Sequence, residues 1–294
     1  MKIAPLSGFP EWLPQDRIVE DRILGALRRT FELHGFSGIE TRAVEPLDQL
    51  LRKGETSKEV YVLNRLQGGP AQDSGLGLHF DLTVPLARYV LENAGKLDFP
   101  FKRYQIQKVW RGERPQDGRF REFVQADVDV VGEQTLAFHN EVELPLVMID
   151  ALSGLPIPRV VVRASNRKVA QGFYEAIGIE DIAETLRIVD KLDKVGPDGV
   201  ARMLIDKVGA SSEQADLALK LAEISGADAS VAERVRALGR RSDLLDEGLE
   251  ELVRLVEEAN ELIAGSVVAD LKIARGLDYY TGSVYESTLV GHED

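Results

Sequence analysis

The stretch FKRYQIQKVWRGERPQDGRFREFVQADVDVVG, residues 101–132, decides the fold. Apolar and polar side chains alternate with a period of two over residues 101–111 and again over 119–130, which predicts two strands. The segment RGERPQDGR between them is rich in glycine, proline and aspartate, so the strands form a hairpin with a long tip. The polar faces hold Arg103, Gln105, Gln107 and Arg111 in the first strand, and Arg119, Arg121, Phe123, Gln125, Asp127 and Asp129 in the second.

A third alternating segment, Leu78–Val84, precedes the hairpin and has His79, Asp81 and Thr83 on its polar side. Three such segments predict a mostly antiparallel sheet with one face packed on helices and the other open. The polar faces of such sheets are usually only solvated, but the density of charged and amide groups here is equally compatible with a binding site. The basic hairpin tip either closes over phosphate groups or is merely solvated.

Helical patterns flank this sheet on both sides in the sequence. Apolar residues at helical spacing predict a helix over Ile18–His34, and an extended segment, Gly38–Val44, follows it up to Pro46. From about residue 166 to 264, glycines divide a series of short helical patterns, and strand character returns from 266 to 289. We therefore predict an α+β fold whose sheet is flanked by helices and is completed on the far side of an inserted helical subdomain.

Composition excludes several classes of protein. Hydrophobic residues make up 44% and charged residues 29% of the 294 residues, which argues against disorder. The net charge of −13 argues against a general polyanion binder, although 102–121 contains seven basic and only two acidic residues. The chain has no cysteine, its four histidines lie far apart, and it has neither a secretory signal nor a long apolar run. We predict a cytoplasmic protein without a metal site built from its own side chains.

Three motifs together resemble the histidyl-tRNA synthetase family, which belongs to the class II aminoacyl-tRNA synthetases. They are FDLTVPLARYV (Phe80–Val90), KVWRGERPQDGRFREFVQADVDVVG (Lys108–Gly132) and ARGLDYYTGSVYE (Ala274–Glu286), and RGLDYYTG is the most specific. The resemblance implies a class II catalytic core formed by residues 1–165 and 265–294, with 166–264 as a helical insertion domain. It also implies a homodimer formed through the first motif, at Ile18–Pro46.

The resemblance implies that ATP binds on the polar side of the hairpin. Arg111 would contact the α-phosphate, where negative charge builds up as the histidine carboxylate attacks, and a guanidinium is a suitable clamp there. Arg119 would hold the outer phosphates or the adenine end. Glu113 would face the adenine amine and Phe123 would stack on the ring. Mg²⁺ would bind the phosphates.

The implied histidine site supplies hydrogen-bond acceptors for the α-ammonium group and partners for the imidazole. A carboxylate, a hydroxyl and an amide oxygen all accept hydrogen bonds, as an ammonium group requires. Arg275 would lie opposite Arg111, so Arg111, Arg275 and Gln125 are the implied catalytic residues. The implied histidine-binding residues are Asp81, Thr83 and Gln125 for the ammonium group, Arg275 for the carboxylate, and Asp129 and Tyr280 for the imidazole, with Tyr279 lining the pocket. No role follows for Asp127.

The implied function is that of a histidine–tRNA ligase, which activates histidine with ATP and transfers it to tRNA(His). The chain ends at Asp294, before the family's third motif and anticodon-binding domain, so we expect a truncated form that makes little histidyl-adenylate alone. Two alternatives are a regulatory subunit of ATP phosphoribosyltransferase and a sensor module that binds uncharged tRNA. Arg111, Gln125 and Arg275 favour the enzyme, because regulatory relatives commonly lose parts of the motifs.

Overall fold

The computed structural model describes residues 4–53, 59–66, 75–274 and 280–292. Contacts divide the chain into two compact units, Met1–Leu136 and Ala137–Asp294, and each is described by itself. This division falls ahead of residue 165, so the partition into a catalytic core and a helical insertion domain stays a prediction. Within the described ranges, no helix is both long and apolar enough to cross a membrane.

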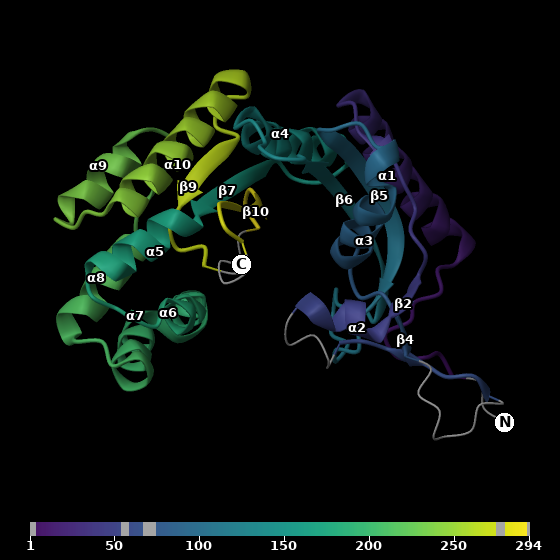
Figure 1. The fold of residues 1–294 in the computed structure, drawn as a ribbon, viewed down its shortest axis with the longest axis horizontal. Helices are drawn as coiled ribbons and strands as arrows, with labels where there is room; N and C mark the ends of the chain where they lie inside the picture. Colours follow the sequence, from purple (N-terminus) through teal and green to yellow (C-terminus); the bar gives the residue numbers. More distant parts are fainter. Residues whose placement is uncertain (1–3, 54–58, 67–74, 275–279, 293–294) are drawn as a thin grey trace. The chain divides into compact units, whose positions relative to one another are not determined.

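The first unit is built around the predicted hairpin. Strands β5 (Phe101–Trp110) and β6 (Glu122–Val131) pair antiparallel along their whole length, and β1 (Ser37–Gly38) pairs parallel to β5. Helix α1 (Pro14–Leu33) runs beside them (Figure 1). Its Phe31 packs on Tyr104 with ring centroids 5.7 Å apart, so the apolar face of the hairpin is the face that meets the helix, as the alternation predicts.

A second small sheet in this unit has the order β2-β4-β3. Its strands are β2 (Val44–Pro46), β3 (Val62–Leu63) and β4 (Leu76–Leu78). The predicted extended segment before Pro46 is therefore two short strands, β1 and β2, which belong to different sheets. The unit also contains α2 (Leu47–Leu50), the 3-10 turn Leu51–Lys53, α3 (Thr83–Asn93) and the 3-10 turn Ala94–Lys96.

The prediction of a strand over Leu78–Val84 is wrong. Strand β4 ends at Leu78, a turn follows, and Thr83 is already the first residue of α3. The residues of the turn are buried on both sides, His79 and Asp81 as well as Phe80 and Leu82, so their alternation does not reflect one buried and one open sheet face. Pro85 suits the first turn of α3, where a backbone N–H has no partner within the helix.

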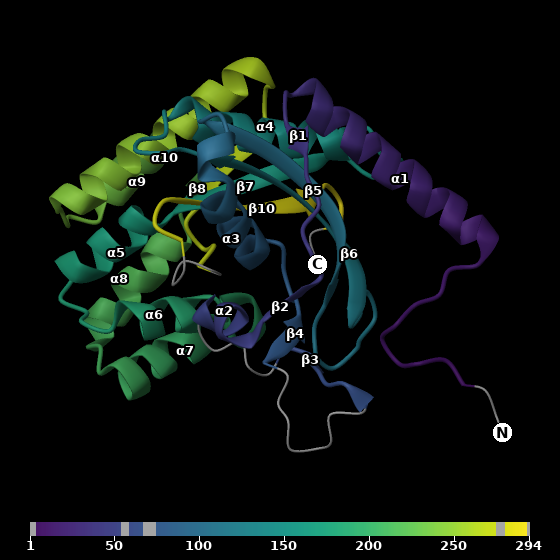
Figure 2. The same cartoon turned by 45° about the vertical axis from the view of Figure 1, so that its right-hand side comes forward.

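The second unit has a four-stranded sheet in the order β10-β7-β9-β8, with long helices beside it (Figure 2). Both β9 and β10 pair with β7, so the strands that follow the helical segment belong to this sheet. The prediction that they complete the sheet of the hairpin is wrong, because β5 and β6 lie in a separate sheet. Its strands are β7 (Val160–Asn166), β8 (Ser225–Gly226), β9 (Val267–Asp270) and β10 (Ser283–Leu289). Its helices are α4 (His139–Ser153), α5 (Arg167–Ala176), α6 (Ile182–Val189), α7 (Leu192–Met203), the π-helical turn Leu204–Val208, α8 (Ser212–Ala222), α9 (Ser230–Ala237) and α10 (Asp243–Leu262).

Two glycines let α5 and α10 approach each other closely. A Cβ atom on Gly172 would lie 2.5 Å from the backbone nitrogen of Leu245, and one on Gly248 would lie 2.6 Å from that of Val169. The helices pack here backbone to backbone, in the middle of the apolar core of this unit.

Candidate functional site

The polar residues of β5 and β6 share one face of the hairpin. The strand register pairs Arg103 with Asp129, Gln105 with Asp127, and Gln107 with Gln125. Side chains of directly paired residues point to the same side of a sheet. The alternation in the sequence therefore predicted the composition of this face correctly.

The floor of this face is buried, although the sequence predicted an open face. Arg103 and Gln105 have no exposed surface, and the segment between β1 and β2 lies against Gln105. Thr41 from that segment accepts a hydrogen bond at its Oγ1 from Gln105 Nε2, 2.9 Å away. Its carbonyl oxygen accepts another from Gln107 Nε2 at 2.7 Å. Local alternation cannot show that a distant segment closes over one end of a strand pair.

Arg111 lies at the end of this face and is held by three groups. Its Nε donates to the carbonyl oxygen of Phe80 at 3.0 Å, and its Nη2 donates to Gln125 Oε1 at 3.4 Å. Its guanidinium carbon lies 5.1 Å from the centroid of the Phe123 ring. Three groups from two segments of the unit, the turn at Phe80 and strand β6, thus fix the position of this cation.

Asp81 lies next to Phe80 and is buried at the start of α3. Its Oδ1 accepts a hydrogen bond from the backbone nitrogen of Val84 at 3.2 Å. The carbonyl of His79 accepts from the backbone nitrogen of Trp110 at 3.1 Å, which ties this turn to the end of β5. The structure thus brings the turn with Asp81 and Thr83 beside Arg111, even though the predicted strand there is absent.

Asp127 orients the amide of Gln125. Gln125 Nε2 donates to both carboxylate oxygens of Asp127, at 3.0 and 2.9 Å. A carboxylate only accepts hydrogen bonds, so the NH₂ group of the amide must face it and the amide oxygen must face away. Asp127, which had no predicted role, therefore determines that Gln125 presents an acceptor toward Arg111 and the open side of the face.

Asp129 and Arg103 form an ion pair across the two strands. Nη2 of Arg103 lies 2.7 Å from Oδ2 of Asp129. Burial raises the pKa of the Asp129 carboxyl above its usual range, while the neighbouring guanidinium opposes that rise. Burial also lowers the pKa of Arg103. An arginine stays protonated in proteins even so.

The hairpin tip carries a further ion pair, between Arg119 and Glu113. Gln116 and Arg119 form a tight bridge at the end of the tip, where Gly118 has a φ of 71°. Arg121 Nε donates to the carbonyl oxygen of Glu113 at 3.0 Å. The two residues predicted to contact the outer parts of ATP therefore lie together, with the Arg119 side chain largely exposed.

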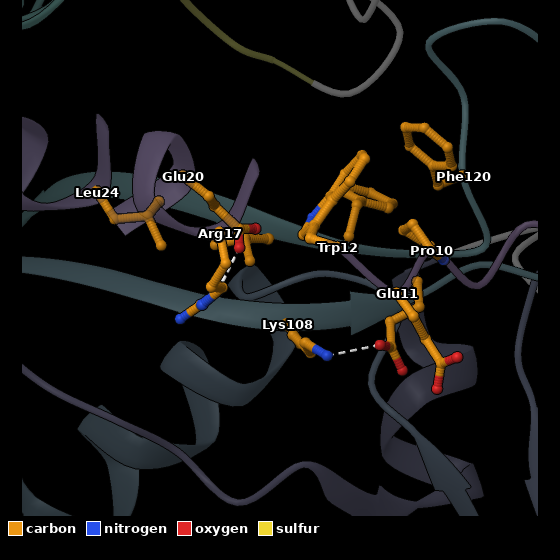
Figure 3. Close-up of a pocket in the computed structure, with 11 residues that line it drawn as sticks. Pro10, Glu11, Trp12, Arg17, Glu20, Leu24, Lys108 and Phe120 are labelled. Atoms are coloured by element: carbon orange, nitrogen blue, oxygen red, sulfur yellow. Dashed lines mark hydrogen bonds and ion pairs between the residues drawn. The ribbon is translucent and has the colours of Figure 1, made fainter. Parts of the chain in front are cut away.

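A cavity of about 550 Å³ opens beside the N-terminal segment and the start of α1 (Figure 3). Lys108, Glu122 and Val124 contribute to it, and they belong to the side of the hairpin opposite Gln125 and Asp129. Trp12 and Phe120 meet there edge to face, with ring centroids 6.1 Å apart. No pattern in the sequence predicted this cavity, although Trp12 before α1 is an aromatic residue that lines it.

A sequence model described as histidyl-tRNA synthetase matches residues 8–293. The chain belongs to the histidyl-tRNA synthetase family. It is 60% identical to a histidine–tRNA ligase of Micrococcus luteus, over 99% of this chain and 66% of that protein. It is 56% identical to one of Thermobifida fusca, over 97% and 66% of the two chains.

Solved structures agree with this membership. The structure of histidyl-tRNA synthetase from Nostoc sp. PCC 7120 matches with a TM-score of 0.88 at 35% identity, over all of this chain and 66% of that one. A Bacillus halodurans protein described as an ATP phosphoribosyltransferase regulatory subunit/histidyl-tRNA synthetase matches at 21% identity with a TM-score of 0.81, which shows the shared fold alone. The prediction of a class II synthetase-like α+β fold is confirmed, and the chain spans just under two thirds of the length of these synthetases.

The segment ARGLDYYTGSVYE (Ala274–Glu286) lies partly outside the described residues. Arg275 and Tyr279 belong to the undescribed range 275–279, so their predicted roles remain predictions. Tyr280 is described and is 50% exposed in the second unit.

Proposed function

We propose that this chain is the part of a histidine–tRNA ligase that binds histidine and ATP and forms histidyl-adenylate. The observation that carries the proposal is the fixed position of Arg111, held between Phe80, Gln125 and Phe123. A cation that is held in place before any ligand binds, beside an amide oxygen and an aromatic ring, suits a site where an amino acid meets a nucleotide. Family membership supports the choice of amino acid.

In the proposed reaction, a carboxylate oxygen of histidine attacks the α-phosphorus of ATP. A bond from that oxygen to phosphorus forms, and the bond to the bridging oxygen of pyrophosphate breaks. Arg111 would stabilise the negative charge on the α-phosphate oxygens, and we assign Arg275 to the substrate carboxylate on the other side. No nucleophile from the protein is needed, so catalysis consists of positioning and electrostatic stabilisation.

The α-ammonium group of histidine would be held by Asp81, Thr83 and the oxygen of Gln125. The burial of Asp81 and the orientation of Gln125 support this assignment, because both present acceptors from fixed positions. We assign Asp129 and Tyr280 to the imidazole nitrogens, with Tyr279 lining the pocket.

ATP would lie over the hairpin, with Phe123 stacked on adenine, Glu113 at its amine and Arg119 at the outer phosphates. The nearness of Arg111 to Phe123 and of Glu113 to Arg119 supports this arrangement. Mg²⁺ usually binds phosphate oxygens together with one or two carboxylates, so we propose that it binds with the nucleotide and neutralises phosphate charge.

We further propose that the product is transferred to tRNA(His), that residues 166–264 form an insertion domain near the tRNA, and that the protein works in the cytoplasm.

A homodimer through the first motif is supported by exposed apolar side chains at the start of α1. Leu13, Ile18 and Val19 are 60, 53 and 55% exposed. If these side chains form the interface, Ile18→Glu should turn a dimer into a monomer in sedimentation velocity. A monomeric unaltered chain would contradict this part.

Titration calorimetry of the 294-residue chain with histidine and with ATP tests the central proposal. We expect both to bind, and Arg111→Ala to weaken ATP binding at least about tenfold, because a hydrogen bond to a charged group contributes about 1.5–3 kcal/mol. Arg202→Ala, in the exposed part of α7, is the matched control and should bind normally. Absence of histidine binding would refute the proposal. Histidine binding without histidine-dependent ATP–pyrophosphate exchange by a chain extended through the third motif would favour a regulatory subunit.

A further inference from the structure

Arg103 is a fully buried cation with unusually few hydrogen-bond partners. Its side chain has no exposed surface. Among the described residues, none accepts a hydrogen bond with good geometry from its Nε, Nη1 or Nη2. The carboxylate of Asp129 lies 2.7 Å from the Arg103 guanidinium, and the charge of Asp127 also acts on it. The short distance makes the electrostatic attraction real, even though the N–H directions do not meet the criteria of a hydrogen bond.

Stability alone does not explain such a pair. Removing two charges from water costs several kcal/mol per ion, and well-packed apolar residues of similar size often give equal or greater stability. Gln105 and Thr41, the neighbours in the same buried floor, are joined by a hydrogen bond without any charge. The effect of Arg103 must therefore be sought in what it does to Asp129.

The ion pair places the two oxygens of the Asp129 carboxylate in different surroundings. Oδ2 is buried against the guanidinium, yet the Asp129 side chain as a whole is 35% exposed. The exposed surface therefore includes the second oxygen, Oδ1, on the polar face of the hairpin. Oδ2 is held by Arg103 in the buried floor, and Oδ1 is directed toward the proposed histidine site.

The carboxylate of Asp127 makes the positive charge of Arg103 necessary for keeping Asp129 ionised. Asp127 lies on the same face, two residues away, and its charge raises the pKa of Asp129 further. The charged groups that face Asp129 are Arg103 from β5 and Asp127 from β6. Without Arg103, a partly buried carboxyl beside a like charge would take up a proton, and it would then no longer be a purely accepting group.

We propose that Arg103 is a positioning residue for the recognition of the histidine ring, which keeps Asp129 ionised and points its Oδ1 at a ring N–H. This inference rests on the proposed histidine site, and it adds a residue from the buried floor that does not itself touch the ligand. It also explains why an arginine lies beneath two carboxylates, one of which orients Gln125 while the other faces the ring.

The test is calorimetric titration of L-histidine into the full chain between pH 7 and 8.5, with four single variants and one double variant. Arg103→Met removes the cation, and we expect it to weaken binding at least about tenfold at pH 7, with partial recovery as the pH rises and Asp129 ionises. Arg103→Lys keeps a cation and should stay within about threefold of the unaltered chain at every pH. Lys102→Met, a change at the next residue of β5, is the control and should have no effect.

Asp129→Asn separates this role from a structural one. In an Asp129→Asn background, Arg103→Met should weaken binding by less than about twofold, because the group that it acts on is gone. An equal loss in both backgrounds, or an Arg103→Met chain with normal affinity and a flat pH profile, would overturn the inference and leave the proposed function standing. An unaltered chain that binds no histidine would overturn both. Circular dichroism shows whether Arg103→Met folds. If it does not, Arg103→Lys and the double variant provide the test, and loss of binding in Arg103→Lys at all pH values would overturn the inference.

Discussion

The close packing of α5 on α10 predicts that alanine at Gly248 destabilises the protein. The added methyl group would lie 2.6 Å from Val169 N and 2.8 Å from Lys168 Cβ. Carbon atoms pack best at about 3.5–4.0 Å, so the backbone of α5 must move away by roughly 1 Å. Overpacking of this kind costs about 1–3 kcal/mol, while replacing glycine by alanine within a helix returns about 0.5–1 kcal/mol. We expect a net loss of about 1–2 kcal/mol.

Urea denaturation followed by circular dichroism measures this change as a lower midpoint. Gly25→Ala in α1 is the matched control, because nothing lies within 4 Å of the new methyl group. It should stabilise the protein by about 0.5–1 kcal/mol through helix propensity alone. The two substitutions therefore have opposite signs. If Gly248→Ala raised the midpoint as Gly25→Ala does, the argument from backbone contact would be wrong.

Three further predictions concern the candidate site. Asp127→Ala should weaken histidine binding about tenfold and ATP binding less, because the amide of Gln125 loses the partner that orients it while Phe80 and Phe123 still hold Arg111; calorimetry with equal histidine affinities would contradict this. Arg111→Lys should weaken ATP binding nearly as much as alanine does, since an ammonium group cannot bond to Phe80 and stack on an aromatic ring together; recovery of normal affinity would argue for charge alone. Burial lowers the pKa of His79 below 6.5 in the folded protein, so its contribution to stability is present above pH 6.5 and is lost as the pH falls and the unfolded chain takes up the proton. His79→Gln should therefore flatten the fall in unfolding free energy between pH 7.5 and 5.5, and an unchanged slope would refute the assignment.

The sequence by itself determined the hairpin and its polar face. A period of two in side-chain character is a local property of a strand, and it fixed which residues of 101–111 and 119–130 share a side before any partner was known. The three motifs likewise determined the family, because residue identity and spacing do not depend on folding. The series of helices between 166 and 264 followed from spacing and glycine positions in the same way.

Only the tertiary structure decided what covers each of these local patterns. Leu78–Val84 alternates like a strand, but it is a turn buried on both sides followed by a helix. Arg103 looks like a solvated arginine in the sequence, yet it is fully buried and the register of two strands pairs it with Asp129. Burial and charge pairing depend on residues far away in the chain, because water is excluded by whichever segment lies on top. Periodicity describes a single element, and it holds no information about the element that packs against it.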